Sequence, residues 1–160
     1  MFHVESYTET KEKNYDLVAN QLKALIEDEP NRIANLSNAS ALLNQFLDDV
    51  NWVGFYLPDS DDELVLGPFQ GVPACVRIGY GKGVCGTAWK EQKTIRVKDV
   101  HEFSGHIACD AASNSEIVVP IFKGDEFIGL LDIDSPSKDR FDEADERGLE
   151  QFVKILEKYL

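Results

Sequence analysis

Two apolar segments, EIVVPIF (116–122) and EFIGLLDID (126–134), are separated only by the turn KGD. Runs rich in β-branched and aromatic residues that are joined by a short glycine-containing turn predict a β-hairpin. The segments VNWVGFYL (50–57) and LVLGPF (64–69), joined by PDSDDE, predict another. Because the strands of a hairpin pair antiparallel, this feature limits the chain to folds built on an antiparallel sheet.

Helical patterns flank these hairpins. Apolar residues at helical spacing predict helices over about 11–28 and 32–49, and a last helix over about 142–159. Helices around a sheet of hairpins predict an α+β architecture.

The segment between the hairpins is glycine-rich and irregular. Here we expect a short strand at 74–78, a short helix at about 84–91 and a strand at 94–97. The length of 160 residues predicts a single domain over 1–160, in which the sheet and its loops span about 50–136.

The formal net charge of −13 argues against nucleic acid and anionic membranes as partners, because both would be repelled. No apolar run approaches the roughly 20 residues of a membrane span. The N-terminal segment also lacks the basic and apolar regions of a signal peptide. We therefore expect a cytoplasmic protein, in which any disulfide among the three cysteines is transient.

The segment GKGVCG at 81–86 matches the pattern G-x-G-x-x-G, which binds phosphate at the start of a helix in dinucleotide-binding folds. That function requires a unit of parallel strands, whereas hairpins dominate this chain. We interpret the glycines as a tight turn that needs positive φ and close backbone approach.

Cysteine and histidine side chains could also bind a metal ion. Structural zinc sites usually contain closely spaced cysteine pairs, and the three cysteines here are 10 and 24 residues apart. We expect neither a metal nor a cofactor. The side chains that could in principle supply four ligands are Cys75, Cys85, Cys109, His101 and His106.

The three cysteines also permit thiol chemistry. Cys75 and Cys85 flank the glycine-rich turn and Cys109 lies in the next long loop, so all three can converge on one site. A free cysteine is most often a small buried hydrophobe, which suits Cys75 in its strand-like segment. Cys85 lies at a predicted helix start, where the helix dipole would lower its pKa. The loop position of Cys109 favours reactivity, although nearby acids would raise the pKa of its thiol.

Three acids cluster at one end of the second predicted hairpin. Glu116 begins one strand, while Asp132 and Asp134 end its partner and, being two residues apart, point to the same face. Carboxyls this close raise at least one pKa, which suits a proton donor near neutral pH. Trp52, in the first hairpin, is either core or an aromatic wall for an apolar ligand group.

Four blocks of the sequence resemble the free methionine-R-sulfoxide reductases, small proteins built on a GAF domain. The blocks are NWVGFYL, LGPFQGVPACVRIGYGKGVCGTA, VKDVHEFSGHIACDAASNSEIVVPI and GLLDIDSP. The resemblance implies a sheet of about six antiparallel strands, with helices on one face and a ligand pocket on the other. It also implies thiol-dependent reduction of free L-methionine-R-sulfoxide to methionine, and it favours a homodimer.

The resemblance further implies catalytic roles for the three cysteines, and a substrate pocket formed by Glu116, Asp132, Asp134 and Trp52. One hypothesis is that the Cys109 thiolate attacks the sulfoxide sulfur while Asp134 or Asp132 protonates the oxygen. Either Cys85 or Cys75 would then form a disulfide with Cys109, recycled by thioredoxin. Attack by Cys85, resolved by Cys109, stays open.

Two functions without this turnover also remain open. The first is a GAF module that binds a small molecule as a sensor, and the second is a redox switch that uses the same thiols.

Overall fold

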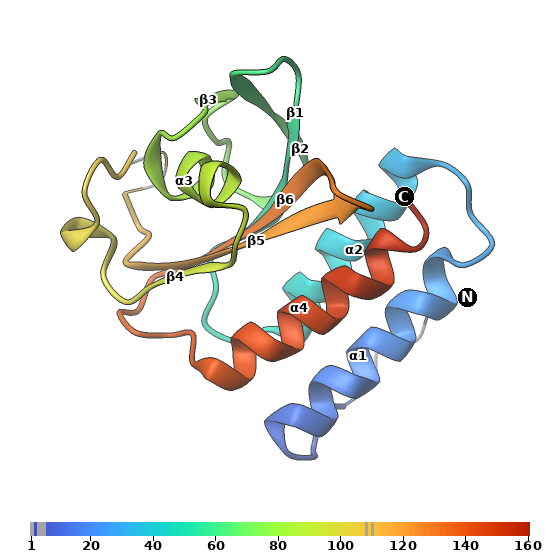
Figure 1. Cartoon of the computed structure of the whole chain (residues 1–160). Coiled ribbons are helices and arrows are strands. Elements are labelled where there is room, and N and C mark those ends of the chain that lie inside the picture. The colour runs from blue at the N-terminus through green and yellow to red at the C-terminus, as the bar shows by residue number, and fades with distance from the viewer. Residues whose placement is uncertain (1, 3–5, 108, 110) are drawn as a thin grey trace.

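The computed structural model describes residues 2, 6–107, 109 and 111–160, which form a six-stranded antiparallel sheet packed against helices (Figure 1). The strand order is β3-β2-β1-β6-β5-β4. The elements are α1 (Lys11–Ile26), α2 (Arg32–Phe46), β1 (Trp52–Pro58), β2 (Glu63–Gly71), β3 (Arg77–Gly79), α3 (Gly83–Glu91), β4 (Ile95–Val97), the 3-10 helix η1 (Val100–Glu102), β5 (Ser115–Lys123), β6 (Glu126–Ser135) and α4 (Glu143–Glu157).

The two predicted hairpins are confirmed as β1–β2 and β5–β6, and they join side by side through β1 and β6 at the centre of the sheet. In this register Trp52 lies opposite Asp134, and Asp134 lies opposite Glu116. Residues directly opposite each other point to the same face, so this row carries one aromatic and two acidic side chains across three strands.

Three long helices cover one face of the sheet (Figure 1). Helix α2 contacts β1 and β2, α4 contacts β5, and α1 packs on α2 and α4. A capping box, in which Asp142 and Asp145 exchange hydrogen bonds with each other's backbone amides, fixes the start of α4. The main apolar core lies between these helices and the sheet, and includes Val53 and Phe55 of β1.

The opposite face carries the short helix α3 and the loop that follows β4. Trp52 and Tyr56, which alternate with Val53 and Phe55, pack there in a smaller apolar cluster. Helices therefore cover one face and the other face is left for a pocket beside α3, as expected for the predicted fold.

Two sequence-based boundaries need correction. Helix α2 ends at Phe46 rather than near 49, because Leu47 is extended and Asp49 adopts a positive φ of 56°. The strand predicted at 74–78 is wrong for its first half, since β3 begins at Arg77. The Cys75 carbonyl accepts a hydrogen bond from the Tyr56 hydroxyl (2.8 Å). At this residue a side chain therefore takes the place of the backbone amide that a neighbouring strand would supply.

The glycine-rich segment at 81–86 forms a tight turn, as interpreted from the sequence. Gly81 and Gly83 have φ values of +74° and +62°. A Cβ at Gly86 would overlap the Gly79 carbonyl. Among the helices of the described residues, none is long and apolar enough to cross a membrane.

Candidate active site

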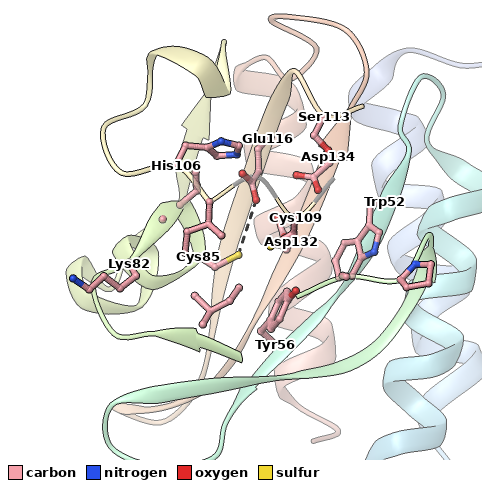
Figure 2. Close-up of a pocket in the computed structure, with 16 residues that line it drawn as sticks. Trp52, Tyr56, Lys82, Cys85, His106, Cys109, Ser113, Glu116, Asp132 and Asp134 are labelled. Atoms are coloured by element: carbon pink, nitrogen blue, oxygen red, sulfur yellow. Dashed lines mark hydrogen bonds between the residues drawn. The ribbon is translucent and has the colours of Figure 1, made fainter. Parts of the chain in front are cut away.

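A small cavity of about 40 Å³ opens on the face that carries α3 (Figure 2). Its walls come from β1, β5, β6, the start of α3 and the loop after η1. Lining side chains that matter for chemistry are Trp52, Tyr56, Cys85, His106, Cys109, Glu116, Asp132 and Asp134. The three acids singled out in the sequence therefore share one cavity with two of the three cysteines.

The strand register explains how the acids meet. Glu116 and Asp134 are direct partners across β5 and β6, and Asp132 lies two residues from Asp134 on the same face. Asp132 is also opposite Gly54 of β1. A Cβ at Gly54 would overlap both Phe69 and the Trp52 ring, so glycine lets the aromatic ring lie beside the acids.

The inner acids are buried, and neither forms an ion pair with a lysine or arginine of the described residues. Burial, followed by the charges of Asp132 and Asp134, raises the pKa of Glu116 well above its ordinary value. Burial likewise raises the pKa of Asp132. One oxygen of Asp132, Oδ1, is buried without a hydrogen-bond partner among the described residues. Such an arrangement favours the protonated form of at least one carboxyl near neutral pH.

Cys85 differs from the sequence expectation. It lies in the first turn of α3, but its Sγ is buried 4.0 Å from Glu116 Oε2 (Figure 2). Burial and the surrounding acids Asp132 and Glu116 raise the pKa of this thiol well above its ordinary value. The expected lowering by the helix dipole is therefore wrong, because loss of solvation and three nearby carboxyls outweigh a partial charge.

Cys75 and Cys109 form a disulfide across 34 residues of sequence, with their Cα atoms 5.5 Å apart. Both are half-buried, and Cys109 also lines the cavity. The bond therefore lies between the loop before β3 and the loop before β5. Cys85 and Cys109 thus line one cavity, Cys75 is joined to Cys109, and Cys85 is the free thiol of the three.

An aromatic wall completes the cavity. The Trp52 ring stacks on Phe69 with ring centroids 5.1 Å apart, and its Nε1 donates to the Val72 carbonyl (3.1 Å). Tyr56 lies next to Trp52, with ring centroids 6.0 Å apart. The sequence interpretation missed Tyr56 and Gly54, although both follow Trp52 at the two-residue period of one strand face.

The two histidines weighed as metal ligands have different surroundings. His106 lines the cavity, and burial, with the charge of His101, lowers its pKa. His101 is exposed, and its Nε2 lies 3.1 Å from Asn114 Oδ1. The five residues weighed from the sequence do not form one ligand set, because Cys75 and Cys109 are bonded to each other.

Comparison with known proteins places this geometry in a family. The GAF domain model matches residues 31–160. The chain is 58% identical to free methionine-R-sulfoxide reductase of Escherichia coli over 137 residues, which is 86% of this chain and 82% of that protein.

Solved structures agree. Free methionine-R-sulfoxide reductase from Neisseria meningitidis, in complex with its substrate, matches with a TM-score of 0.94 at 45% identity, covering 99% of this chain and 95% of that one. The fRMsr of Staphylococcus aureus in complex with substrate matches with a TM-score of 0.87 at 60% identity, covering 98% and 99%.

The sheet order, the helical layer and the pocket on the opposite face define a GAF domain. Within the GAF-domain proteins, the chain belongs to the family of free methionine-R-sulfoxide reductases, which confirms the resemblance found in its motifs.

Proposed function

We propose that this chain reduces free L-methionine-R-sulfoxide to methionine in the cavity beside α3. The observation that carries this proposal is the disulfide between Cys109, which lines the cavity, and Cys75, in a cavity that also holds three carboxyls. A thiol that can be reoxidised next to a proton donor is what sulfoxide reduction requires. The names of the relatives in Escherichia coli and Neisseria meningitidis support the same substrate.

In the proposed order, Cys109 attacks and Cys75 resolves. The Cys109 thiolate attacks the sulfoxide sulfur, the oxygen takes a proton, and methionine departs as Cys109 becomes a sulfenic acid. The Cys75 thiol then attacks the Cys109 sulfur and releases water, leaving the disulfide. Cys85 is a poor nucleophile near neutral pH, because its raised pKa keeps it protonated.

The buried carboxyls supply the proton. Burial raises the pKa of both Glu116 and Asp132, so we propose that one of them donates to the departing oxygen. This adds Glu116 to the two donors considered from the sequence, Asp132 and Asp134. Asp134, half-buried, is then placed to hold the substrate ammonium, with Trp52 against the methyl end.

The position of the disulfide fits this order of events. Cys109 lines the cavity and is bonded to Cys75 in this structure, so it has no thiolate with which to attack a sulfoxide. We propose that turnover of substrate begins only after the disulfide is reduced. Reduction would thus come first in each cycle and disulfide formation last.

A dithiol must regenerate the enzyme, and we propose that it is thioredoxin. Val76, next to Cys75, and Ile107, near Cys109, expose 58% and 40% of their surface. Apolar groups beside a disulfide offer contact area to a protein reductant. We expect Val76→Ser to raise KM for thioredoxin and to leave the rate with dithiothreitol unchanged.

The test of the reaction is NADPH oxidation coupled through thioredoxin reductase and thioredoxin. Free methionine-R-sulfoxide, free methionine-S-sulfoxide and a peptide-bound sulfoxide are offered in parallel. We expect turnover with the first alone, and its loss in Cys109→Ser. Turnover kept in Cys109→Ser but lost in Cys85→Ser would reverse the thiol roles. Absence of turnover with all three would favour a GAF sensor or a redox switch.

Trapping the intermediate tests the order of the thiols directly. In Cys75→Ser, one equivalent of substrate should leave a sulfenic acid on Cys109, which dimedone labels and mass spectrometry locates. A label on Cys85 would contradict the proposed order.

We also propose that residues 1–160 act as one domain and that the protein is a cytoplasmic homodimer. The resemblance to the reductase family supports the dimer, and light scattering after size exclusion measures it. A monomeric mass at micromolar concentration would contradict this part of the proposal.

A further inference from the structure

Three potential ligand atoms meet at the inner end of the cavity, and each comes from a different element. Cys85 of α3, Glu116 of β5 and Asp132 of β6 each offer one atom, and these atoms lie within 4.8 Å of one another. All three residues are buried. Figure 2 shows the Cys85 sulfur pointing toward the Glu116 carboxylate.

The hydrogen bonding of this group is incomplete. Among the described residues, Asp132 Oδ1 is buried without a hydrogen-bond partner, and no lysine or arginine forms an ion pair with Asp132 or Glu116. Asp132 does hydrogen-bond with Glu116 and Cys85. A buried carboxylate oxygen without a hydrogen-bond donor is costly. The unpartnered oxygen thus marks a position where a positively charged ligand would be stabilised.

The chemistry of the three donors selects the kind of cation. Hard ions such as Mg²⁺ and Ca²⁺ prefer sets made of oxygen alone, whereas a thiolate selects softer metals. Zn²⁺ accepts cysteine sulfur and carboxylate oxygen together, and three protein ligands leave one position for water. On binding, the Cys85 thiol would lose its proton to solvent, and the thiolate would ligate the metal.

We propose that Cys85, Glu116 and Asp132 form a binding site for a thiophilic divalent cation, represented by Zn²⁺, at the inner end of the cavity. The cation is a competitor of the substrate and has no part in turnover. This competition, unlike the binding itself, rests on the proposed function. The expectation of no metal from cysteine spacing concerned a different set of ligands, because spacing along the chain does not reveal donors from three separate elements.

The first experiment uses the disulfide-linked protein, in which Cys85 is the one free thiol among the chain's three cysteines, all of which are described. Co²⁺ is titrated as a spectroscopic substitute for Zn²⁺. We expect one site per chain, a thiolate-to-cobalt charge-transfer band in the near ultraviolet, and loss of that band when Zn²⁺ is added.

Matched variants identify the ligands. Cys85→Ser should abolish the band, and Asp132→Asn should weaken binding about tenfold or more, since even an outer-shell partner is worth about 10- to 100-fold. The control is Asp125→Asn, an exposed acid in the β5–β6 turn, which should bind as the wild type does. Cys85→Ala and Glu116→Gln provide second variants if one of the first does not fold, as judged by circular dichroism.

Two results would overturn the site. One is the absence of a charge-transfer band in the wild type, and the other is Co²⁺ affinity that persists unchanged in Cys85→Ser. The latter would indicate binding to the acidic surface, a real alternative at a net charge of −13.

The competition is measured in a Cys75→Ser/Cys109→Ser double variant, which cannot form the disulfide and keeps Cys85 as its single thiol. Free methionine-R-sulfoxide should raise the apparent Kd for Co²⁺ in proportion to its concentration. Cobalt binding without competition would overturn the competitor role and would count against the proposed place of the substrate. Loss of cobalt binding with normal reductase turnover would overturn the metal site alone.

Discussion

Two buried aspartates on opposite faces of the sheet have opposite surroundings. Asp145, on the helical face, is 1% exposed and accepts hydrogen bonds from the Tyr15 hydroxyl (2.7 Å), Lys11 Nζ (3.1 Å) and Arg140 (3.3 Å). Asp132, in the cavity, is 6% exposed, and one of its oxygens has no hydrogen-bond partner in the described part of the chain. Its neighbours include another acid and a thiol.

These surroundings indicate that the charge of Asp145 has a structural role and that the cavity acids have a functional one. The partners of Asp145 come from α1 and from the segment before α4, so this carboxylate connects the N-terminal helix to the C-terminal one. Among the residues that the structure describes, the cavity acids form no ion pair that would connect two elements. Their cost in stability is typical of a site whose missing partner is a ligand.

The largest expected effect comes from neutralising the cavity acid. We expect Asp132→Asn to lower kcat/KM by about 100-fold or more, the usual contribution of a general acid or base. The free energy of unfolding should stay the same or rise, because an amide removes a buried charge that has no cation beside it. Steady-state kinetics and urea denaturation measure the two quantities. A large loss of stability would show that the cavity acid is structural after all.

The reverse outcome is expected on the helical face. Removing the carboxylate in Asp145→Ala leaves Lys11, Arg140 and the Tyr15 hydroxyl without their shared partner, and should cost about 3 kcal/mol in stability. Below the melting temperature, kcat/KM should remain within a factor of about two, since the site lies across the sheet. Glu143→Gln is the control, because this α4 residue is 80% exposed. An equal loss in both variants would refute the special role of Asp145.

These two aspartates also show what a sequence can reveal. The period of two along a strand places Asp132 and Asp134 on one face, and the hairpin brings Glu116 opposite, so the acid cluster follows from local rules. The role of Asp145 does not follow from local rules, because its partner Tyr15 is 130 residues away and their contact depends on how α1 and α4 pack.

The cysteines were harder to assign than the acids. Local rules place Cys85 at the start of a helix and so predict a lowered pKa. Burial beside acids of β5 and β6 raises that pKa instead. The pairing of Cys75 with Cys109 depends on the paths of two loops, and no periodicity describes those. Tyr56 and Gly54, by contrast, could have been found, because they share a strand face with Trp52.

Two glycines, one on the helical face and one beside the cavity, allow the two faces to be compared through smaller effects. A Cβ at Gly148 of α4 would overlap the Tyr15 ring, and one at Gly54 would overlap the Trp52 ring. Overpacking of this kind costs about 1–3 kcal/mol. We expect Gly148→Ala to lower stability without changing KM, because it displaces the partner of Asp145. Gly54→Ala should raise KM, because it displaces the aromatic wall of the cavity.

Melting temperatures and KM values for both glycine variants decide the outcome. An unchanged KM in a folded Gly54→Ala protein would remove Trp52 from the substrate site.

The smallest effects should appear in the pH dependence of stability, with opposite signs on the two faces. Burial would raise the pKa of Asp142, but the amide of Asp145 and the ammonium of Lys11 lower it to about 2. A lowered pKa in the folded state means that stability is lost as the pH falls from about 4 toward 2.

The cavity acids have raised pKa values in the folded state, so the folded protein binds more protons than the unfolded one above the ordinary value of 4.5 for Glu116. Stability should therefore decline as the pH rises from that value. Urea denaturation from pH 2 to 8 measures both limbs. Asp142→Asn should flatten the acidic limb alone, and Glu116→Gln the limb above 4.5. If Glu116→Gln leaves that upper limb unchanged, the Glu116 carboxyl is ionised in the folded protein and cannot be the proton donor, which leaves Asp132 in that role.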